Sequence, residues 1–287
     1  MKLTKGKLME TLKKKNDGWT TYQARKIAHI SIRRVNQVWN EYLSSGEIPD
    51  LGNKVGRPSR PLSDQEKAVV KAAFEKYSVC ASGLRPLIER DFGTSINHNR
   101  IHRILVELGY AKQKGHKDVR KKDWIRYERR HSLSAVHIDW YYDARSQRWV
   151  FAVIDDASRK LLALVECDSP TTEASIFGMK IALQYGRIRE CISDHGSQFV
   201  SNIGGDSLFK AFLDKEGIRQ ILCRIKHPQS NGKVEKFFSL YKNKRILFAN
   251  REKFMAWYNE VRPHRSLRFD ELETPSQAFQ RKMRAEA

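Results

Sequence analysis

Apolar side chains follow two different periods along this chain of 287 residues. Up to about residue 110 they recur every three to four positions, which predicts amphipathic helices. We expect these helices over residues 2–15, 20–28, 31–43, 64–77, 82–91 and 98–108. From Ser134 onward, short apolar runs predict strands over residues 135–140, 149–154, 161–165, 188–193 and 219–223. Further helices are expected over residues 171–185 and 208–216, and from Gly232 onward.

The order of these elements predicts the fold class. Three strands with short connections, followed by alternating helices and strands, are typical of a mixed five-stranded sheet with helices on both faces. Two all-α blocks precede this α/β part, and a Gly-, Pro- and Ser-rich stretch over residues 44–62 separates them.

The first helical block has the layout of a DNA-reading motif. Its third helix, which Ser31 can cap, carries an apolar stripe of Ile32, Val35, Trp39 and Tyr42. Its polar side chains suit base edges and phosphates: Arg33, Arg34, Asn36, Gln37 and Asn40. A short turn before such a helix is the helix-turn-helix arrangement, whose second helix enters the major groove. An ordinary three-helix bundle with a solvated face is the alternative.

The second helical block offers a similar arrangement. Ser63 and Glu66 form a capping box at its start. Its last helix presents Asn99, Arg100 and Arg103 on the side opposite its apolar residues. This makes it a second helix-turn-helix candidate, and two such blocks suit a protein that recognises an extended DNA sequence.

Positive charge is concentrated in the first half of the chain. The formal net charge is +21, and residues 1–130 carry 29 Lys and Arg against 14 Asp and Glu. Because such a surface repels itself unless a polyanion neutralises it, we expect nucleic acid as the partner. In the linker, Gly56-Arg57-Pro58 resembles the centre of an AT-hook, an arm that inserts arginine into the minor groove. A plain basic linker is an equal alternative for Arg57.

Other global features point to the cytoplasm. The chain has no apolar run long enough to span a membrane, and its first residues lack the apolar region of a secretory signal. The four cysteines are widely spaced and form no Cys-x-x-Cys pair. We therefore expect reduced, mostly buried cysteines in a cytoplasmic protein.

Three carboxylates follow the predicted sheet in a way that suggests metal chemistry. Asp139 is expected to end the first strand and Asp194 the fourth, while Glu235 lies in the first turn of the helix after the fifth. Since ligands bind at the ends of adjacent strands, these carboxylates can converge at one edge. Their mutual repulsion is tolerable if cations lie between them, and carboxylate ligation selects Mg²⁺ or Mn²⁺.

Several motifs in this part of the chain occur together in one known family. They are His137-Ile138-Asp139-Trp140, Asp155-Asp156-Ala157-Ser158-Arg159, Ser193-Asp194-His195-Gly196-Ser197-Gln198-Phe199, the run from His227 to Glu235, Tyr258-Asn259 with Arg262-Pro263-His264, and Thr274-Pro275. Over about residues 132–280 the chain thus resembles the DDE transposases of insertion sequences, which are relatives of retroviral integrases. The resemblance implies an RNase H-like catalytic core.

The resemblance also implies a mechanism and partners. Asp139 would bridge two Mg²⁺ or Mn²⁺ ions, with Asp194 on one and Glu235 on the other, for DNA strand cleavage and strand transfer. The partners would be double-stranded DNA, as terminal inverted repeats and target, and further copies of the chain in a synaptic dimer or higher oligomer at the nucleoid. Lys233 and Lys236 would contact phosphates, or would form a solvated basic face.

Nearby polar residues are expected to have structural roles. His137 shares a strand face with Asp139, yet we expect it to be packed or hydrogen-bonded. Asp155 and Asp156 are expected to tie a turn. Arg262 and His264 are expected to fasten the C-terminal segment to the core.

The resemblance completes the predicted domain order. The predicted parts are a helix-turn-helix domain (1–46), a linker (47–62), a second helix-turn-helix domain (63–111), a basic linker (112–131), the catalytic core (132–248) and a helical C-terminal segment (249–287). No cysteine precedes Cys80, so the zinc module of retroviral integrases is missing, which favours a transposase. A catalytically silent, transposase-derived regulator and a nuclease that only nicks are the alternatives.

Overall fold

The computed structural model describes residues 3–51, 60–113, 127–201, 205–223 and 231–283. They form two compact units, Met1–Pro61 and Leu62–Ala287. Three predicted features lie outside the described residues: Arg57, most of the basic linker, and the run from His227 to Ser230.

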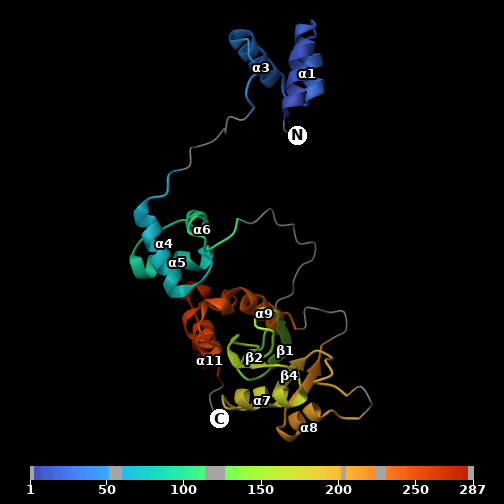
Figure 1. Ribbon diagram of the computed structural model, residues 1–287, viewed down its shortest axis with the longest axis vertical. Helices are drawn as coiled ribbons and strands as arrows, with labels where there is room; N and C mark the ends of the chain where they lie inside the picture. Colours follow the sequence, from blue (N-terminus) through green and yellow to red (C-terminus); the bar gives the residue numbers. More distant parts are fainter. Residues whose placement is uncertain (1–2, 52–59, 114–126, 202–204, 224–230, 284–287) are drawn as a thin grey trace. The chain divides into compact units, whose positions relative to one another are not determined.

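The first unit consists of the three predicted helices, shown in blue in Figure 1. They are α1 (Lys5–Asn16), α2 (Thr21–Ala28) and α3 (Ile32–Ser45). Thr20 and Gln23 form a capping box on α2, and the Ser31 side chain accepts a hydrogen bond from the Arg34 amide to cap α3. The stripe predicted for α3 was wrong at Ile32, which is 41% exposed, because Val38 takes the buried position instead.

The second unit begins with the three other predicted helices. They are α4 (Asp64–Tyr77), α5 (Ala81–Phe92) and α6 (His98–Glu107). The predicted capping box of Ser63 and Glu66 is present. Both Glu66 oxygens also accept hydrogen bonds from the Arg100 guanidinium, at 2.6 Å each, which fastens α6 to α4. These bonds lower the pKa of Glu66 to about 2.

The predicted mixed sheet is confirmed, with five strands in the order β3-β2-β1-β4-β5. The strands are β1 (Val136–Asp143), β2 (Arg148–Asp155), β3 (Leu161–Cys167), β4 (Glu190–Ser193) and β5 (Arg219–Leu222). β1, β2 and β3 pair antiparallel, whereas β4 pairs parallel to both β1 and β5. This is the sheet that the sequence predicted for an RNase H-like core.

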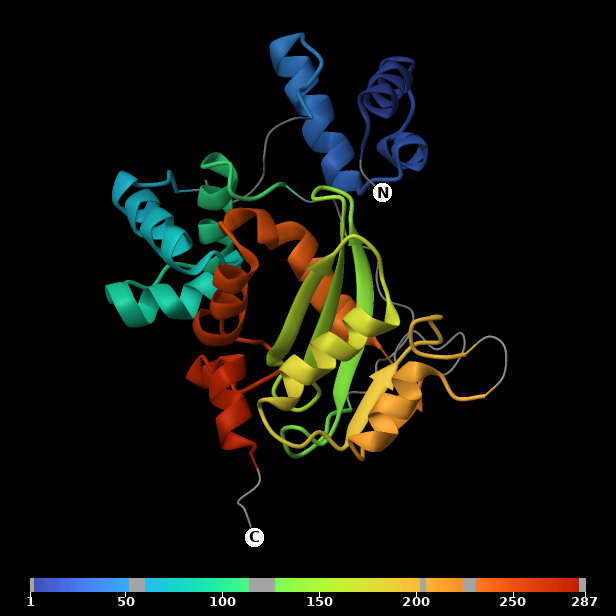
Figure 2. The ribbon, with the colours of Figure 1, turned by 60° about the horizontal axis from the view of Figure 1, so that its bottom comes forward.

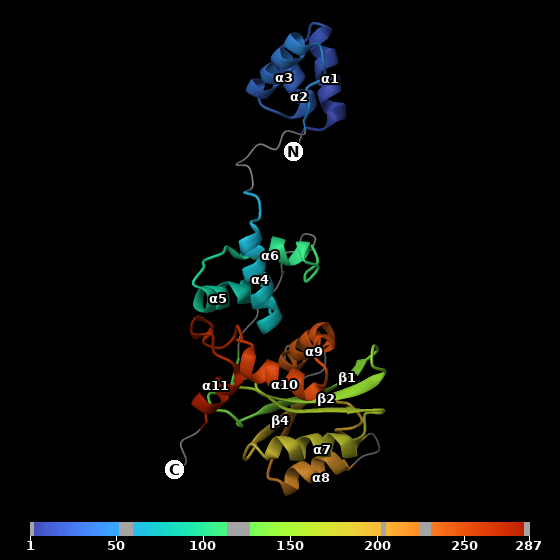
Figure 3. The ribbon, with the colours of Figure 1, turned by 60° about the vertical axis from the view of Figure 1, so that its left-hand side comes forward.

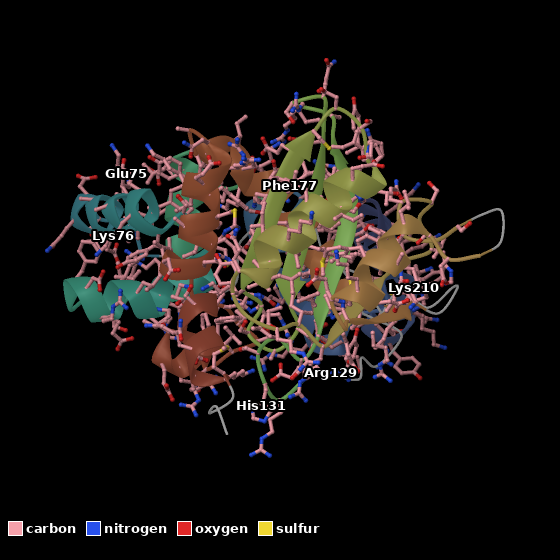
Figure 4. The ribbon with its side chains drawn as sticks, turned by 90° about the horizontal axis from the view of Figure 1, so that it is seen from below. Glu75, Lys76, Arg129, His131, Phe177 and Lys210 are labelled. Carbon is pink, nitrogen blue, oxygen red and sulfur yellow. The ribbon has the colours of Figure 1, made fainter. Side chains whose placement is uncertain are left out.

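Helices cover both faces of the sheet (Figure 3). One face carries α7 (Thr172–Leu183) and α8 (Leu208–Lys215), and the other carries α9 (Gly232–Lys244) and α10 (Arg251–Ala256). Figure 2 shows α7 lying across the strands. Gly178 allows this close approach, since a Cβ there would lie 2.5 Å from the Phe151 ring. Phe177 points the other way and is 56% exposed on the outer side of α7 (Figure 4).

Alternation along β2 divides the interior into two cores. Val150, Ala152 and Ile154 pack toward α9 and α10, while Phe151 and Val153 pack toward α7 and α8. The core on the α9 side is continuous with the interior of α4, α5 and α6. The segments predicted as a second helical domain, a core and a C-terminal segment therefore lie in one compact unit.

The C-terminal segment is tied to this unit by side-chain hydrogen bonds. The Trp257 Nε1–H donates to the carbonyl of Tyr77 at the end of α4 (2.7 Å). The Asn259 side chain bonds both the N–H and the C=O of Leu161 at the start of β3, at 2.9 Å each. Pro275 then opens α11 (Pro275–Arg281) behind a capping box made by Thr274 and Gln277. None of the described helices combines the length and the apolar character that a membrane span requires.

We predict that Asn259→Ala lowers the free energy of unfolding by about 2–3 kcal/mol, because it leaves two buried backbone groups of Leu161 without partners. Urea unfolding followed by circular dichroism measures the change. Asn243→Ala is the matched control, since Asn243 is exposed on α9. Equal effects of the two substitutions would contradict this assignment.

Candidate active site

Asp139 lies in the middle of β1, and the expectation that it ends the strand was wrong. β1 pairs with β2 all the way to Asp143, whereas β4 pairs with β1 only at Val136 and His137. Asp139 therefore lies two residues beyond the last pair with β4, where β4 ends at Ser193 and Asp194 follows. The longer hairpin with β2 extends β1, but Asp139 still lies beside the end of β4.

The loop after β4 holds Asp194 through a turn and an aromatic anchor. Oδ1 of Asp194 accepts a hydrogen bond from the Gly196 amide (2.9 Å). Phe199, which is buried against Phe151 and Phe209, fixes the other end of the loop in the core. Asp194 itself is exposed.

Glu235 lies in the first turn of α9, as predicted, and its side chain is exposed. The predicted stripe that packs α9 on the sheet is confirmed, since its members are all buried: Val234, Phe237, Phe238 and Tyr241. A carboxylate near a helix N-terminus is favoured by the helix dipole. The helix thus presents Glu235 on a rigid element with its charge in solvent.

Asp139 lies within electrostatic range of the other two carboxylates. Burial, together with the charges of Asp194 and Glu235, raises the pKa of Asp139 to about 7, although the hydrogen bond from the Trp140 amide lowers it. Burial and the same three carboxylates raise the pKa of the Cys223 thiol to about 11. The ends of β4 and β5, the middle of β1 and the first turn of α9 therefore share one negative field.

The donor chemistry of this group fits a divalent cation, because carboxylate oxygens are the ligands that Mg²⁺ and Mn²⁺ prefer. Among the described residues, however, no three His, Cys, Asp or Glu side chains are gathered closely enough to hold a metal ion. The raised pKa of Asp139 and the absence of a preformed ligand set in the described part of the chain are compatible, because electrostatic interactions extend over longer distances than coordination bonds. Ligation by all three would require the carboxylates to approach one another.

A buried polar network joins α9 to β1 beside this group. Nε2 of His137 donates to Oδ1 of Asp156 (2.7 Å), and its Nδ1 lies 3.3 Å from Oδ1 of Asn231. The Lys233 ammonium pairs with the same Asp156 oxygen. Arg129, labelled in Figure 4, donates its backbone N–H to the other oxygen (2.6 Å). Burial favours protonation of Asp156, but His137 and Lys233 outweigh it and hold the pKa below its usual range.

The outcomes for neighbouring residues follow from these contacts. His137 is fully buried and hydrogen-bonded, as expected. Asp155 ties the turn, since it accepts from the Ser158 amide (2.8 Å) and from the Leu133 amide (2.7 Å). Asp156 does more than close a turn, because it connects strand, turn and helix.

Comparison with known proteins places this region in a family. The integrase core domain model matches residues 129–228. An "Uncharacterized protein" of Archaeoglobus fulgidus is 35% identical over 89 residues, which cover 31% of this chain and 70% of that protein. The chain belongs to the proteins with an integrase core domain.

Two further proteins resemble this integrase core. The "Putative integrase ORF3" of Spiroplasma virus SpV1-C74 is 28% identical over 181 residues, which cover 52% of this chain and about half, 49%, of that protein. The catalytic core domain of BIV integrase aligns with 52% of this chain and 95% of its own, with 14% identity and a TM-score of 0.41.

The residues predicted to contact DNA have different surroundings. Exposed side chains are found at Arg33, Asn36, Gln37, Asn40, Asn99, Arg103 and Lys236. Arg34 is half-buried and donates to Gln37 (2.7 Å). Arg100 is held by Glu66, and the Lys233 ammonium lies against Asp156 and over the Tyr127 ring. DNA contacts by these residues stay predictions.

Sequence reasoning missed the position of Cys223 beside the carboxylates of the integrase core. The expectation that the cysteines are mostly buried was also wrong, since Cys80 is exposed and only Cys191 is buried. The signal for Cys223 was present, because it follows β5 as Asp194 follows β4, and parallel strands end at the same edge.

We predict that Asp139→Asn reduces the loss of stability with rising pH. The pKa of about 7 exceeds the ordinary 3.8, so the folded protein binds more protons than the unfolded chain between these values. Stability therefore falls as pH rises through this window, and the variant lacks this contribution. Urea unfolding at several pH values in a chelator measures it, with the exposed Asp168→Asn as control. An unchanged pH slope would contradict the shared negative field.

We predict that Asp156→Asn lowers the free energy of unfolding by about 3 kcal/mol, because it leaves Lys233 without its buried counter-charge. Thermal unfolding measures this loss. Asp214→Asn breaks an exposed pair with Lys210 on α8 and is expected to cost less than about 1 kcal/mol. A similarly small cost for Asp156→Asn would show that the network contributes little.

Proposed function

We propose that this chain is a DNA transposase that binds terminal inverted repeats and catalyses metal-dependent DNA strand cleavage and strand transfer. The observation that carries the proposal is the convergence of Asp139, Asp194 and Glu235 into one negative field in a chain with an integrase core. Like charges close to a partly buried carboxylate are costly, and a catalytic cation site is a reason to retain them. The proposed DNA substrate would place the protein at the nucleoid.

Asp139, Asp194 and Glu235 would hold two Mg²⁺ or Mn²⁺ ions. When bound, such ions lower the pKa of a water or a DNA 3′-hydroxyl and stabilise charge at the phosphorus. Asp139 has to lose its proton before it can act as a ligand, so its raised pKa makes ligation weaker at acidic pH. Asn231 and His137 keep the first turn of α9 in register with β1, which positions Glu235 relative to Asp139.

DNA recognition is assigned to the helical blocks. We propose helix-turn-helix reading by α3, through exposed Arg33, Gln37 and Asn40. On α6, Asn99 and Arg103 are exposed and can reach DNA, whereas Arg100 is occupied by Glu66. The charge of residues 1–130 supplies the sequence-independent attraction to phosphates. Pairing two DNA ends calls for a dimer or higher oligomer.

The test uses a labelled duplex that carries the inverted repeat flanking the coding region, incubated with Mg²⁺ or Mn²⁺. The full-length protein is expected to cut at the end of the repeat and to join that end to other DNA. Glu235→Gln is expected to reduce both products at least about a hundredfold while it leaves binding unchanged, since it removes a proposed ligand. Glu252→Gln, an exposed change on α10, is the matched control.

Two results would contradict the proposal in different ways. Binding without cleavage by the wild type would favour the catalytically silent regulator. Cleavage without any joined product would favour a nuclease that only nicks.

A further inference from the structure

A basic cavity of about 240 Å³ lies between α9, the turn after β2 and the C-terminal segment. Its lining includes Arg159 from the turn, Lys233 and Lys236 from α9, and Arg262 and His264 from the C-terminal segment. No Asp or Glu is found among the described residues that line it. The cavity thus gathers positive charge from three separate segments of the chain.

Arg159 occupies its place at an energetic cost. It has φ of 65° in the turn before β3, a left-handed conformation that glycine adopts without strain. It is only 7% exposed, and its Nη2 pairs with Glu128 (3.0 Å). Its Nη1 is buried and has no hydrogen-bond partner among the described residues. A strained backbone and an unpaired buried donor at one arginine are typical of a binding site.

Arg262 lines the same cavity, and within the described part of the chain it also has a buried nitrogen without a hydrogen-bond partner. Its Nη1 is also buried without a hydrogen-bond partner among the described residues, and its guanidinium lies over the Tyr258 ring, 5.6 Å from the centroid. Burial, and the charge of Arg265, lower the pKa of Arg262. Two buried donors from distant parts of the sequence therefore line one cavity without an acceptor.

The nearby carboxylates neutralise only part of this positive charge. Asp156 pairs with Lys233, and Glu128 is shared between Arg159 and Lys282. Burial and the charge of Arg159 lower the pKa of Lys233 to about 8, so the cations of the cavity repel one another. The cavity has an excess of positive charge even with its carboxylate neighbours present.

We propose that this cavity binds a phosphate group. A phosphate offers several charged oxygens, so one group can accept from both guanidinium forks and from Lys236. The cavity volume of about 240 Å³ leaves space for atoms attached to the phosphate. Phe237 and Leu240 supply an apolar wall for those atoms.

The cavity is distinct from the carboxylate group. Lys233, Lys236 and Leu240 follow one another at helical spacing along one side of α9, and Glu235 does not belong to that row. The phosphate can come from the DNA backbone or from free phosphate. The proposal does not depend on transposase activity, because phosphate binding is measured without cleavage.

The first experiment measures the thermal unfolding midpoint of the full chain, without divalent metal, as inorganic phosphate replaces chloride at constant ionic strength. Phosphate is expected to raise the midpoint of the wild type. Arg159→Gln and Arg262→Gln are each expected to weaken the apparent affinity at least about tenfold, the loss expected for a charge-assisted bond. Arg251→Gln, which removes a partly exposed arginine paired with Glu252, is the matched control and should keep the wild-type affinity.

A further variant, at Lys236, tests phosphate binding even if Arg159→Gln or Arg262→Gln fails to fold. Lys236 is exposed on α9, so Lys236→Gln is expected to fold normally and to weaken phosphate binding severalfold.

The second experiment distinguishes the two sources. It measures the affinity of each variant for a DNA duplex over a range of salt concentrations, in a chelator. If the phosphate belongs to DNA, the arginine variants bind the duplex more weakly than Arg251→Gln does, and their salt dependence falls by about one phosphate contact. If free phosphate is the ligand, all variants bind the duplex alike, and phosphate still raises the midpoint of the wild type with saturating DNA.

Two results would overturn the proposal. One is that phosphate acts no differently from chloride while duplex affinity is the same in every variant. The other is that Arg251→Gln loses as much phosphate or duplex affinity as Arg159→Gln, since the effect would then be one of general charge.

Discussion

Side chains, rather than a backbone ladder, join the first turn of α9 to β1. Asn231 donates to the carbonyl of Ile138 (3.4 Å) and faces His137, while Lys233 and His137 meet on Asp156. Because this network is buried, its polar groups cannot form hydrogen bonds to bulk water in place of those to one another. The buried stripe of α9 then packs on the sheet. The side chains on α9, Glu235 among them, are therefore positioned by the network and by this packing.

Two groups of unbalanced charge lie on different sides of the same helix. The charges of Asp194 and Glu235 help to raise the pKa of Asp139, and the guanidiniums of Arg159 and Arg262 have buried nitrogens without acceptors among the described residues. A cation would relieve the first group and an anion the second. A nucleic acid that binds together with divalent cations would supply both the cation and the anion. This agrees with the integrase core of the chain.

The second helical block contributes to this arrangement through packing. Its interior is continuous with the core beneath α9, and Trp257 bonds the end of α4. The Arg100 side chain that the sequence offers to DNA is used to hold α6 against α4. A polar residue on a helix face can therefore stabilise the fold or bind a ligand. Its hydrogen-bond partners in the structure distinguish these two roles.

Local patterns in the sequence predict the helices, the strands and the positions of the carboxylates near strand ends. Caps such as Ser63 and Thr20, and the period of apolar residues, depend on near neighbours, so a local pattern predicts them. Three features follow only from the folded chain: β1 continues past Asp139, Val38 replaces Ile32 in a core, and Arg159 and Arg262 share a cavity. Strand pairing, burial and charge balance depend on residues far apart in the chain, and no local pattern records which of them meet.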